Sequence, residues 1–495
     1  MQRHPGLFLA GYSLTTVIRG PERRDPLLAC DEKPIHPCCR VRLEHEAKMS
    51  GSQTEASEPV TPPGDSLVGS YFVAAYPPFS QWTVAALAQY RHRLTQPGTL
   101  PSRVPLGLYV HIPFCTERCQ YCYYLSYAGK THDRIDAYLD ALLVELASYA
   151  RQPALAGRGL DFVYFGGGTP SLLSPARILR LLRGLAQSFP WNAVREVTFE
   201  CAPKTVTLPK LVTLREAGVT RLSLGVQQLD DDLLARNGRI HLVRDVERAY
   251  ADIQRAAFEV VNIDLMVGMV GETDESFYRS LDRVVAMAPD SVTIYQLEIP
   301  PNTPLYRALR DRPLETKVPS WEVKRSRLDE AFARLEQAGY TVRSAYAAVR
   351  DAIRHRFLYM EEQYRGSDLL GIGVSSFSYL NGVHHQNLAS YEPYMESLRA
   401  GTLPLGRAYA LNDEERLVRE FVLQLKLGKI ERAYFRDKFG VDVDRRFAEP
   451  LSQCSAEGWL HVDPASITLT RQGLLHVDRM IPSFYLPEHR GVSYC

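Results

Sequence analysis

The chain has 495 residues, which is too long for one ordinary domain and favours two or three. Its hydrophobic fraction of 45% and charged fraction of 23% are typical of a globular protein. Lys and Arg number 58 against 57 for Asp and Glu, so the charge balance gives no reason to expect a nucleic-acid or membrane partner. The apolar runs are too short for a membrane-spanning helix, and residues 7–10 make a poor signal peptide, so we expect a cytoplasmic protein.

The N-terminal part differs in composition from the rest of the chain. Residues 1–65 are rich in Arg, Pro, Ser, Thr and Glu without a sustained apolar period, so we expect a disordered extension. Met49 is a second candidate, beside Met1, for the native start. An aromatic and Pro-rich lead-in is expected at 66–105, with most of its aromatic residues at 71–79.

Between residues 106 and 310 a strand-then-helix pattern repeats. We expect strands at 108–112, 162–165, 196–199, 221–226, 260–263 and 292–297. The clearest helix between them has the helical apolar period, at Ile135, Tyr138, Leu139, Leu142, Leu143 and Leu146. Alternating strands and helices predict an α/β fold, here an open parallel (β/α)6 partial TIM barrel. A flat doubly wound sheet is the alternative.

Two further segments follow the expected barrel. We expect residues 311–410 to cap the barrel or link it to the rest. Helices and short strands at 411–495 predict a smaller, mostly helical, winged-helix-like domain. Such modules often bind DNA, but this one mixes acidic and basic residues without a basic stripe, so we expect no nucleic acid.

A cluster of cysteines follows the first expected strand. Cys115, Cys119 and Cys122 have the spacing C-x3-C-x2-C within eight residues. Three thiolates can hold a [4Fe–4S] cluster and leave one iron open for a small ligand with an amine and a carboxylate, such as S-adenosylmethionine. The alternatives are three structural cysteines or a zinc site, for which His111 and His132 are available but lack finger-like spacing.

With Tyr121 just before the third cysteine, this spacing resembles the radical S-adenosylmethionine signature. The stretch YVHIPFC at 109–115 is similar to one branch, the oxygen-independent coproporphyrinogen III oxidase-like proteins, and the resemblance extends over about residues 106–480. It implies a [4Fe–4S] cluster on Cys115, Cys119 and Cys122 and the cleavage of S-adenosylmethionine to a 5′-deoxyadenosyl radical.

The resemblance also implies where S-adenosylmethionine binds. Polar residues and a glycine run at 166–168 stand at the C-terminal ends of expected strands, where parallel barrels place their chemistry. Glycines there let backbone N–H groups approach a ligand closely. The positions that match the family's cofactor contacts are Tyr109, Tyr121, Gly167, Gly168, Thr169, Glu200, Gln227, Arg239 and Asp264. No catalytic residue is identified.

The chain departs from the family pattern at three places. Tyr124 stands where the true oxidases carry a further cysteine, and Val270 stands where proline is usual. Residues 359–364 read Tyr-Met-Glu-Glu-Gln-Tyr where the related heme chaperones carry His-Asn-x-x-Tyr-Trp. These departures favour the branch that performs C-methylation or cyclopropanation at an sp² carbon, with a second S-adenosylmethionine as one-carbon donor. The alternatives are coproporphyrinogen III dehydrogenase-like decarboxylation and heme trafficking.

Tyrosines flank the cysteine loop at Tyr121, Tyr123, Tyr124 and Tyr127. They would suit a small-molecule substrate that is aromatic or tetrapyrrole-like, although core packing explains them equally well. We also expect an electron donor such as flavodoxin or ferredoxin.

Overall fold

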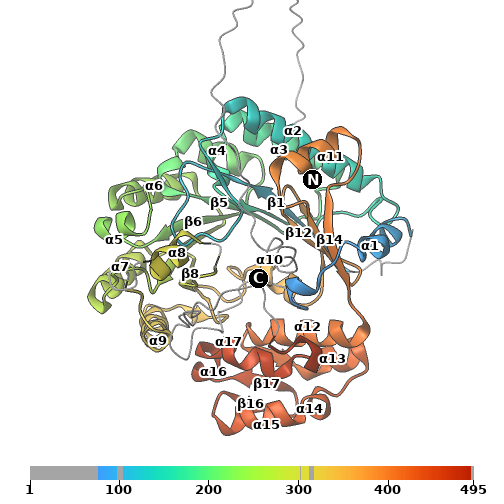
Figure 1. Ribbon diagram of the computed structural model, residues 1–495. Coiled ribbons are helices and arrows are strands. Elements are labelled where there is room, and N and C mark those ends of the chain that lie inside the picture. The colour runs from blue at the N-terminus through green and yellow to red at the C-terminus, as the bar shows by residue number, and fades with distance from the viewer. Residues whose placement is uncertain (1–75, 97–103, 302, 312–316, 492–495) are drawn as a thin grey trace, which may run out of the picture. The chain divides into compact units, whose positions relative to one another are not determined.

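Figure 1 shows a computed structural model of the chain, which describes residues 76–96, 104–301, 303–311 and 317–491. The extension expected at 1–65, most of the lead-in expected at 66–105 and the choice between Met1 and Met49 therefore lie outside the described residues. No helix in the described ranges is long and apolar enough to cross a membrane.

One sheet of twelve strands dominates the structure, in the order β14-β13-β12-β11-β1-β4-β5-β6-β7-β8-β10-β9. Its six central strands run parallel, at β1 (Leu106–Ile112), β4 (Phe162–Gly167), β5 (Glu196–Cys201), β6 (Arg221–Gln227), β7 (Val260–Val267) and β8 (Ser291–Gln296). These are the six strands expected from the sequence. The predicted α/β fold with a parallel central sheet is confirmed.

Helices connect these strands and lie outside the curved sheet (Figure 1). They are α2 (His132–Ala150), α3 (Pro175–Ser188), α4 (Leu208–Glu216), α5 (Asp231–Arg236), α6 (Val243–Ala256) and α7 (Asp274–Met287). Helix α2 shows why they form there. The Thr131 side chain caps its first turn by accepting from Arg134 N, and its apolar stripe, which includes Tyr138 and Leu142, is buried.

Residues 341–410, expected to cap or link the barrel, extend the same sheet at both edges. Strand β10 (Ala347–Val349) pairs antiparallel with β8 and with β9 (Thr341–Val342), and β11 (Asp368–Ile372) pairs parallel with β1. Antiparallel strands β12 (Phe377–Leu380), β13 (Val383–Asn387) and β14 (Leu405–Ala410) complete the order. The other helices up to residue 410 are α1 (Leu87–Leu94), α8 (Pro304–Asp311), α9 (Trp321–Gln337), α10 (Leu358–Tyr364) and α11 (Tyr391–Arg399).

A second hydrophobic core, built mainly from the C-terminal elements, includes Phe421, Phe435 and Phe447. A three-stranded sheet, β15 (Lys429–Glu431), β17 (Ser466–Leu469) and β16 (Leu460–Val462), packs with α12 (Asp413–Leu425), α13 (Arg432–Phe439), α14 (Val443–Arg446), α15 (Ala448–Ala456), α16 (Arg471–Leu475) and α17 (Val477–Met480). A buried ion pair of 3.0 Å between Arg325 of α9 and Asp478 of α17 joins this part to the barrel helices.

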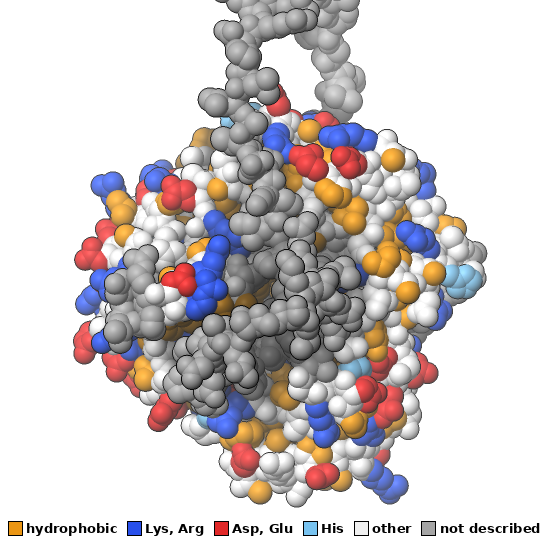
Figure 2. Space-filling model, viewed as in Figure 1, with side chains coloured by type: hydrophobic (Ala, Val, Ile, Leu, Met, Phe, Trp, Pro, Cys, Tyr) orange, Lys and Arg blue, Asp and Glu red, His pale blue; other side chains and the backbone are white. Residues whose placement is uncertain are grey.

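Charged side chains of both signs are interspersed over the face shown in Figure 2. This distribution agrees with the near-zero net charge of the sequence. A surface with mixed charges offers no extended positive stripe to a polyanion on that face.

A buried ion pair between β5 and β6 fixes the loop before α10. Glu196 Oε2 lies 3.1 Å from Arg221 Nε, and both side chains are almost fully buried. Glu196 also accepts a hydrogen bond from the backbone N of Tyr359 at 3.0 Å, while Arg221 donates to two carbonyls of the preceding turn. The pair therefore fixes the position of the Tyr359 backbone relative to β5 and β6.

We predict that Glu196→Ala lowers the free energy of unfolding by about 3 kcal/mol, because it leaves Arg221 buried without its counter-ion. Urea unfolding of the anaerobic chain measures this. Asp282→Ala, which breaks an exposed pair with Arg334, is the control and is expected to cost about 0.5 kcal/mol or less. Equal losses in the two variants would contradict a special role for the buried pair.

Candidate active site

The cysteine loop begins where β1 ends, and residues from other strands reach its sulfurs. Short strand β2 (Phe114–Cys115) pairs with β3 (Tyr127–Ala128), and the three cysteines lie on and between these strands. Thr169 Oγ1 donates to Cys115 Sγ at 3.5 Å, and Arg239 Nη1 donates to Cys119 Sγ at 3.2 Å. The fold thus brings two of the expected cofactor residues to two of the expected iron ligands.

Burial favours the protonated form of the Cys115 and Cys122 thiols. It raises the pKa of Cys115 and raises that of Cys122 to about 12, so metal binding would have to displace protons. Over the described ranges, no three His, Cys, Asp or Glu side chains converge as ligands of one ion. A cubane cluster does not require such convergence, because each thiolate binds a different iron.

The glycine run at 166–168 packs closely against the start of the cysteine loop. The N–H groups of Gly168 and Thr169 donate to the carbonyls of Ile112 and Phe114, at 2.8 and 2.7 Å. A Cβ on Gly167, which has φ +111°, would lie 2.4 Å from the His111 ring. Glycine is therefore required for this close approach, and the run positions Thr169 beside Cys115. These two N–H groups bind backbone, although the sequence suggested that they face a ligand.

Two expected cofactor residues are carboxyls inside the barrel. Glu200 accepts from Tyr164 OH at 2.6 Å and Gly167 N at 3.3 Å, and burial raises its pKa to about 7. Asp264 accepts from Ser223 Oγ at 2.9 Å and from the Asn262 amide, and burial raises its pKa to about 6. Near neutral pH these pKa values leave both carboxyls at least partly ionised, Asp264 more than Glu200.

Several buried polar atoms at the mouth lack a protein partner among the described residues. They are Oε1 of Gln227, Nε of Arg239 and Oε1 of Gln296. Gln227 has φ +67°, a strained conformation for a non-glycine residue, at an irregularity in the β6–β7 pairing. A second nitrogen of Arg239, Nη2, donates to Gly225 O at 2.7 Å. Unsatisfied atoms and backbone strain together fit a site that a polar ligand completes.

Two other expected cofactor residues, Tyr109 and Tyr121, support the cysteine loop, and the buried OH of Tyr121 has no partner among the described residues. Tyr109 OH bonds to His111 Nδ1 at 3.1 Å, and His111 Nε2 bonds to Leu125 O at 3.1 Å. Tyr121 is buried in a small apolar cluster with Met269 and Leu297. Tyr109 thus braces the cysteine loop through His111, and the Tyr121 ring packs the loop onto the barrel.

Comparisons with known proteins agree with this arrangement. Residues 109–284 match the model of the radical SAM superfamily, and residues 411–476 match that of the HemN C-terminal domain. The oxygen-independent coproporphyrinogen III oxidase of Escherichia coli is 30% identical over 402 residues, covering 77% of this chain and 85% of that protein. The chain belongs to this family of radical S-adenosylmethionine proteins.

Other matches extend the comparison. Heme chaperone HemW of Bacillus subtilis is 28% identical over 76% of this chain and 98% of that protein. The solved coproporphyrinogen III oxidase of Escherichia coli, described as a radical SAM enzyme, superposes with a TM-score of 0.71 at 26% identity, covering 83% of this chain and 96% of that one. As a radical S-adenosylmethionine protein, the chain uses a [4Fe–4S] cluster and S-adenosylmethionine.

One residue at this radical S-adenosylmethionine site escaped the sequence analysis. Asn237, fully buried, accepts from Val270 N at 3.0 Å and donates to Val270 O at 3.1 Å. Its carbonyl accepts from Gln120 N of the cysteine loop at 3.3 Å. Asn237 thus joins that loop to the β7–α7 loop, two residues before Arg239. Its position just ahead of Gly238-Arg239 was the only sequence signal.

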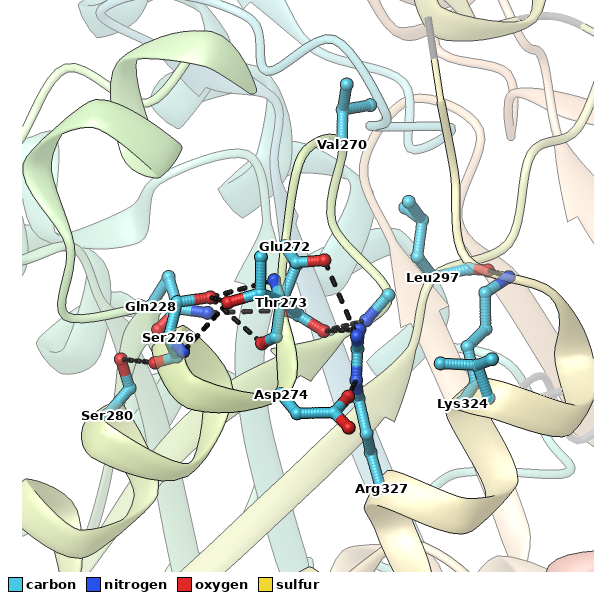
Figure 3. A network of polar contacts seen from close by, with 12 residues as sticks. Gln228, Val270, Glu272, Thr273, Asp274, Ser276, Ser280, Leu297, Lys324 and Arg327 are labelled. Atoms are coloured by element: carbon cyan, nitrogen blue, oxygen red, sulfur yellow. Dashed lines mark hydrogen bonds and ion pairs between the residues drawn. The ribbon is translucent and has the colours of Figure 1, made fainter.

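Figure 3 shows the polar network that fixes the β7–α7 loop. Glu272 accepts from Gly268 N and from Arg327 Nη1, each at 2.8 Å, and from Gln228 Nε2 at 3.3 Å. Val270 lies at the tip of the same loop (Figure 3). Arg327 comes from α9, so a helix that follows the barrel strands holds a loop that contacts the cysteine loop.

We predict that the protein reconstituted without oxygen binds about four irons per chain and that the triple variant Cys115→Ala, Cys119→Ala, Cys122→Ala binds none. Iron analysis and visible absorption measure this. Cys454→Ala is the control, because Cys454 is buried in the C-terminal core, and it should keep the cluster. A full cluster in the triple variant would overturn the assignment.

We predict that Asp264→Ala weakens S-adenosylmethionine binding about ten- to hundredfold, through loss of a partly charged hydrogen-bond acceptor, while iron content stays unchanged. Ser223 and Asn262 bond to each other at 3.0 Å and can stay paired. Equilibrium dialysis and 5′-deoxyadenosine formation with dithionite are the measurements.

Arg239→Ala is the informative comparison for that prediction. The sequence analysis gave both residues as cofactor contacts and neither as an iron ligand. Because Arg239 donates to Cys119 Sγ, we now expect its removal to lower iron content as well. Wild-type binding in Asp264→Ala would place the cofactor elsewhere in the barrel.

Proposed function

We propose that this chain transfers a one-carbon unit to an sp² carbon of an aromatic small molecule, as a methyl group or a cyclopropane carbon, with a second S-adenosylmethionine as donor. The observation that carries the proposal is a wall of tyrosines on the inner side of the barrel, next to the cysteine loop.

The wall is built from tyrosines of β1, β4, α10 and the cysteine loop. Tyr359 of α10 stacks on Tyr164 of β4, with ring centroids 4.4 Å apart and planes at 29°. Tyr164 in turn stacks on Tyr109 of β1 at 6.0 Å. Tyr124, in the position of the oxidases' further cysteine, stacks on Tyr123 and is 41% exposed. Stacked rings with an open face suit a flat aromatic substrate.

The charges near this wall support a substrate with few carboxylates. Glu200 and Glu298 are acidic groups whose charges act on Tyr124, and the Asp264 charge acts on Tyr164. Of the arginines at the cysteine loop, Arg118 already donates to Cys122 O at 2.9 Å and Arg239 to Gly225 O at 2.7 Å. A porphyrinogen carries several carboxylates, which such a wall would repel unless further cations neutralised them.

The residues fit the cofactors of the family. When bound, the cluster supplies the electron that cleaves S-adenosylmethionine to methionine and a 5′-deoxyadenosyl radical. Cys115, Cys119 and Cys122 would hold the cluster. Gln227 and Arg239 offer unmatched polar atoms for the ribose and the carboxylate of S-adenosylmethionine. The tyrosines would orient the substrate ring and exclude water, and flavodoxin or ferredoxin would supply electrons.

A second candidate is oxidative decarboxylation of a porphyrinogen, which the 30% identity to the Escherichia coli oxidase favours. Heme trafficking is the third, and the similarity to the Bacillus subtilis heme chaperone supports it.

The products distinguish the three candidates. The reduced, reconstituted protein is incubated with methyl-labelled S-adenosylmethionine and small-molecule extracts of the source organism, or with coproporphyrinogen III. We expect S-adenosylhomocysteine together with 5′-deoxyadenosine, and label in a small aromatic product. Carbon dioxide from coproporphyrinogen III without S-adenosylhomocysteine would establish decarboxylation instead. Tight heme binding without either product would establish trafficking.

A further inference from the structure

The turn after β11 lies beside the strand that leads into the cysteine loop. Strand β11 pairs parallel with β1, with Ile372 opposite Val110, so both strands end at the same edge of the sheet. Gly373 follows β11 directly with φ +103°, and a Cβ there would lie 2.9 Å from His111 O. Ser375 has φ +61°, a strained value for a non-glycine residue. This strained turn therefore packs closely against β1 just before the cysteines.

A buried carboxyl holds the turn in place. Glu145 of α2 is fully buried, and its Oε2 accepts from Gly373 N at 2.8 Å and from Tyr394 OH at 2.6 Å. Its Oε1 accepts from Asn387 Nδ2 at 2.6 Å, and the same amide donates to Gly373 O at 2.9 Å. Burial raises the pKa of Glu145 to about 7, and the three donors oppose that rise. Glu145 and Asn387 together bind both backbone polar groups of Gly373.

A tyrosine of the same helix connects the turn to the cysteine loop. Tyr138 OH accepts from Val374 N at 3.0 Å and donates to His111 O at 2.9 Å. The ring of His111 continues the connection, because its Nε2 bonds to Leu125 O at 3.1 Å, three residues after Cys122. The carboxyl, the turn, His111 and the far end of the cysteine loop are thus joined by an unbroken series of hydrogen bonds.

We propose that Glu145 is a positioning residue for the cleavage of S-adenosylmethionine: by holding the turn at 373–376 it fixes His111, and through His111 the cysteine loop. Cleavage requires the cluster and the sulfonium in a defined geometry, and small displacements of reacting groups are costly in rate. One-carbon transfer and decarboxylation both begin with this cleavage. The inference therefore rests on the radical chemistry of the proposed function and not on its product.

Three variants of the full, cluster-loaded chain test this. Glu145→Gln keeps the size of the side chain but turns an N–H group toward one of its donors, and Tyr138→Phe removes only the hydroxyl between the turn and β1. Tyr340→Phe is the matched control, because it removes a buried hydroxyl that donates to Pro289 O at 2.7 Å. Pro289 precedes β8, at the edge of the sheet opposite the cysteine loop. The double variant of Glu145→Gln and Tyr138→Phe completes the set.

The measurements are iron release to excess chelator, 5′-deoxyadenosine formation with dithionite at several S-adenosylmethionine concentrations, and the thermal midpoint. We expect Glu145→Gln and Tyr138→Phe each to release iron about fivefold faster and to lower kcat for cleavage about tenfold, with KM within about twofold of wild type. The double variant should be no slower than the slower single variant, because residues that act through one set of contacts are not additive. Tyr340→Phe should lose similar thermal stability but keep wild-type iron release and cleavage.

Wild-type iron release and cleavage in Glu145→Gln and Tyr138→Phe would overturn the inference. The same losses in Tyr340→Phe would also overturn it, since they would follow from lower stability alone, and so would additive losses in the double variant. If Glu145→Gln does not fold, Tyr394→Phe replaces it, because it removes one donor to the carboxyl and should give the same changes at smaller size.

Failure here is distinct from failure of the proposed function, which the products decide. Normal positioning effects without S-adenosylhomocysteine would exclude one-carbon transfer and leave the role of Glu145 intact. S-adenosylhomocysteine from a Glu145→Gln chain with wild-type kcat would do the reverse.

Discussion

The candidate active site depends on two backbone hydrogen bonds whose groups take no part in the reaction. Gly168 N and Thr169 N donate to the connection between β1 and β2, and they fix the cysteine loop relative to the next strand of the barrel. The contact is so close that a Cβ on Gly168 would lie 2.7 Å from Phe114 O. Once this register is set, Thr169 reaches Cys115 and the tyrosines of β1 and β4 face the same space. Displacing the glycine run would therefore displace the cluster and the substrate wall together.

The mouth of the barrel contains buried polar atoms without hydrogen-bond partners and one residue with a strained backbone. Gln227 is strained at positive φ, and buried atoms of Gln227, Arg239 and Gln296 have no partner in the described ranges. The strained backbone and the unpaired atoms persist because the contacts of the surrounding sheet hold them in place. They lower the stability of the ligand-free chain. Binding of a polar cofactor recovers that free energy, so the cofactor stabilises the fold by mass action.

The sequence predicted the parallel strands well because they are buried on both faces and read as apolar runs. It missed the edge strands because they are short or polar, as in β13, which reads Val-His-His-Gln-Asn. The cysteine spacing identified the iron ligands as candidates, since that signal is local. The role of Asn237 could not be predicted, because it depends on contacts with Val270 and Gln120, which lie far away in the sequence.

Val270 occupies a position where proline is usual in the family, and its N–H is one of the two groups that bind the Asn237 side chain. A proline has no N–H to offer, so a rigid ring at 270 and this hydrogen bond are mutually exclusive ways of holding the same loop. Exchanging Val270 for proline would therefore remove the donor to a fully buried amide oxygen. A Val270→Pro substitution would make the loop more rigid but would leave the Asn237 oxygen without its donor, so it would stabilise the loop only if Asn237 were changed as well.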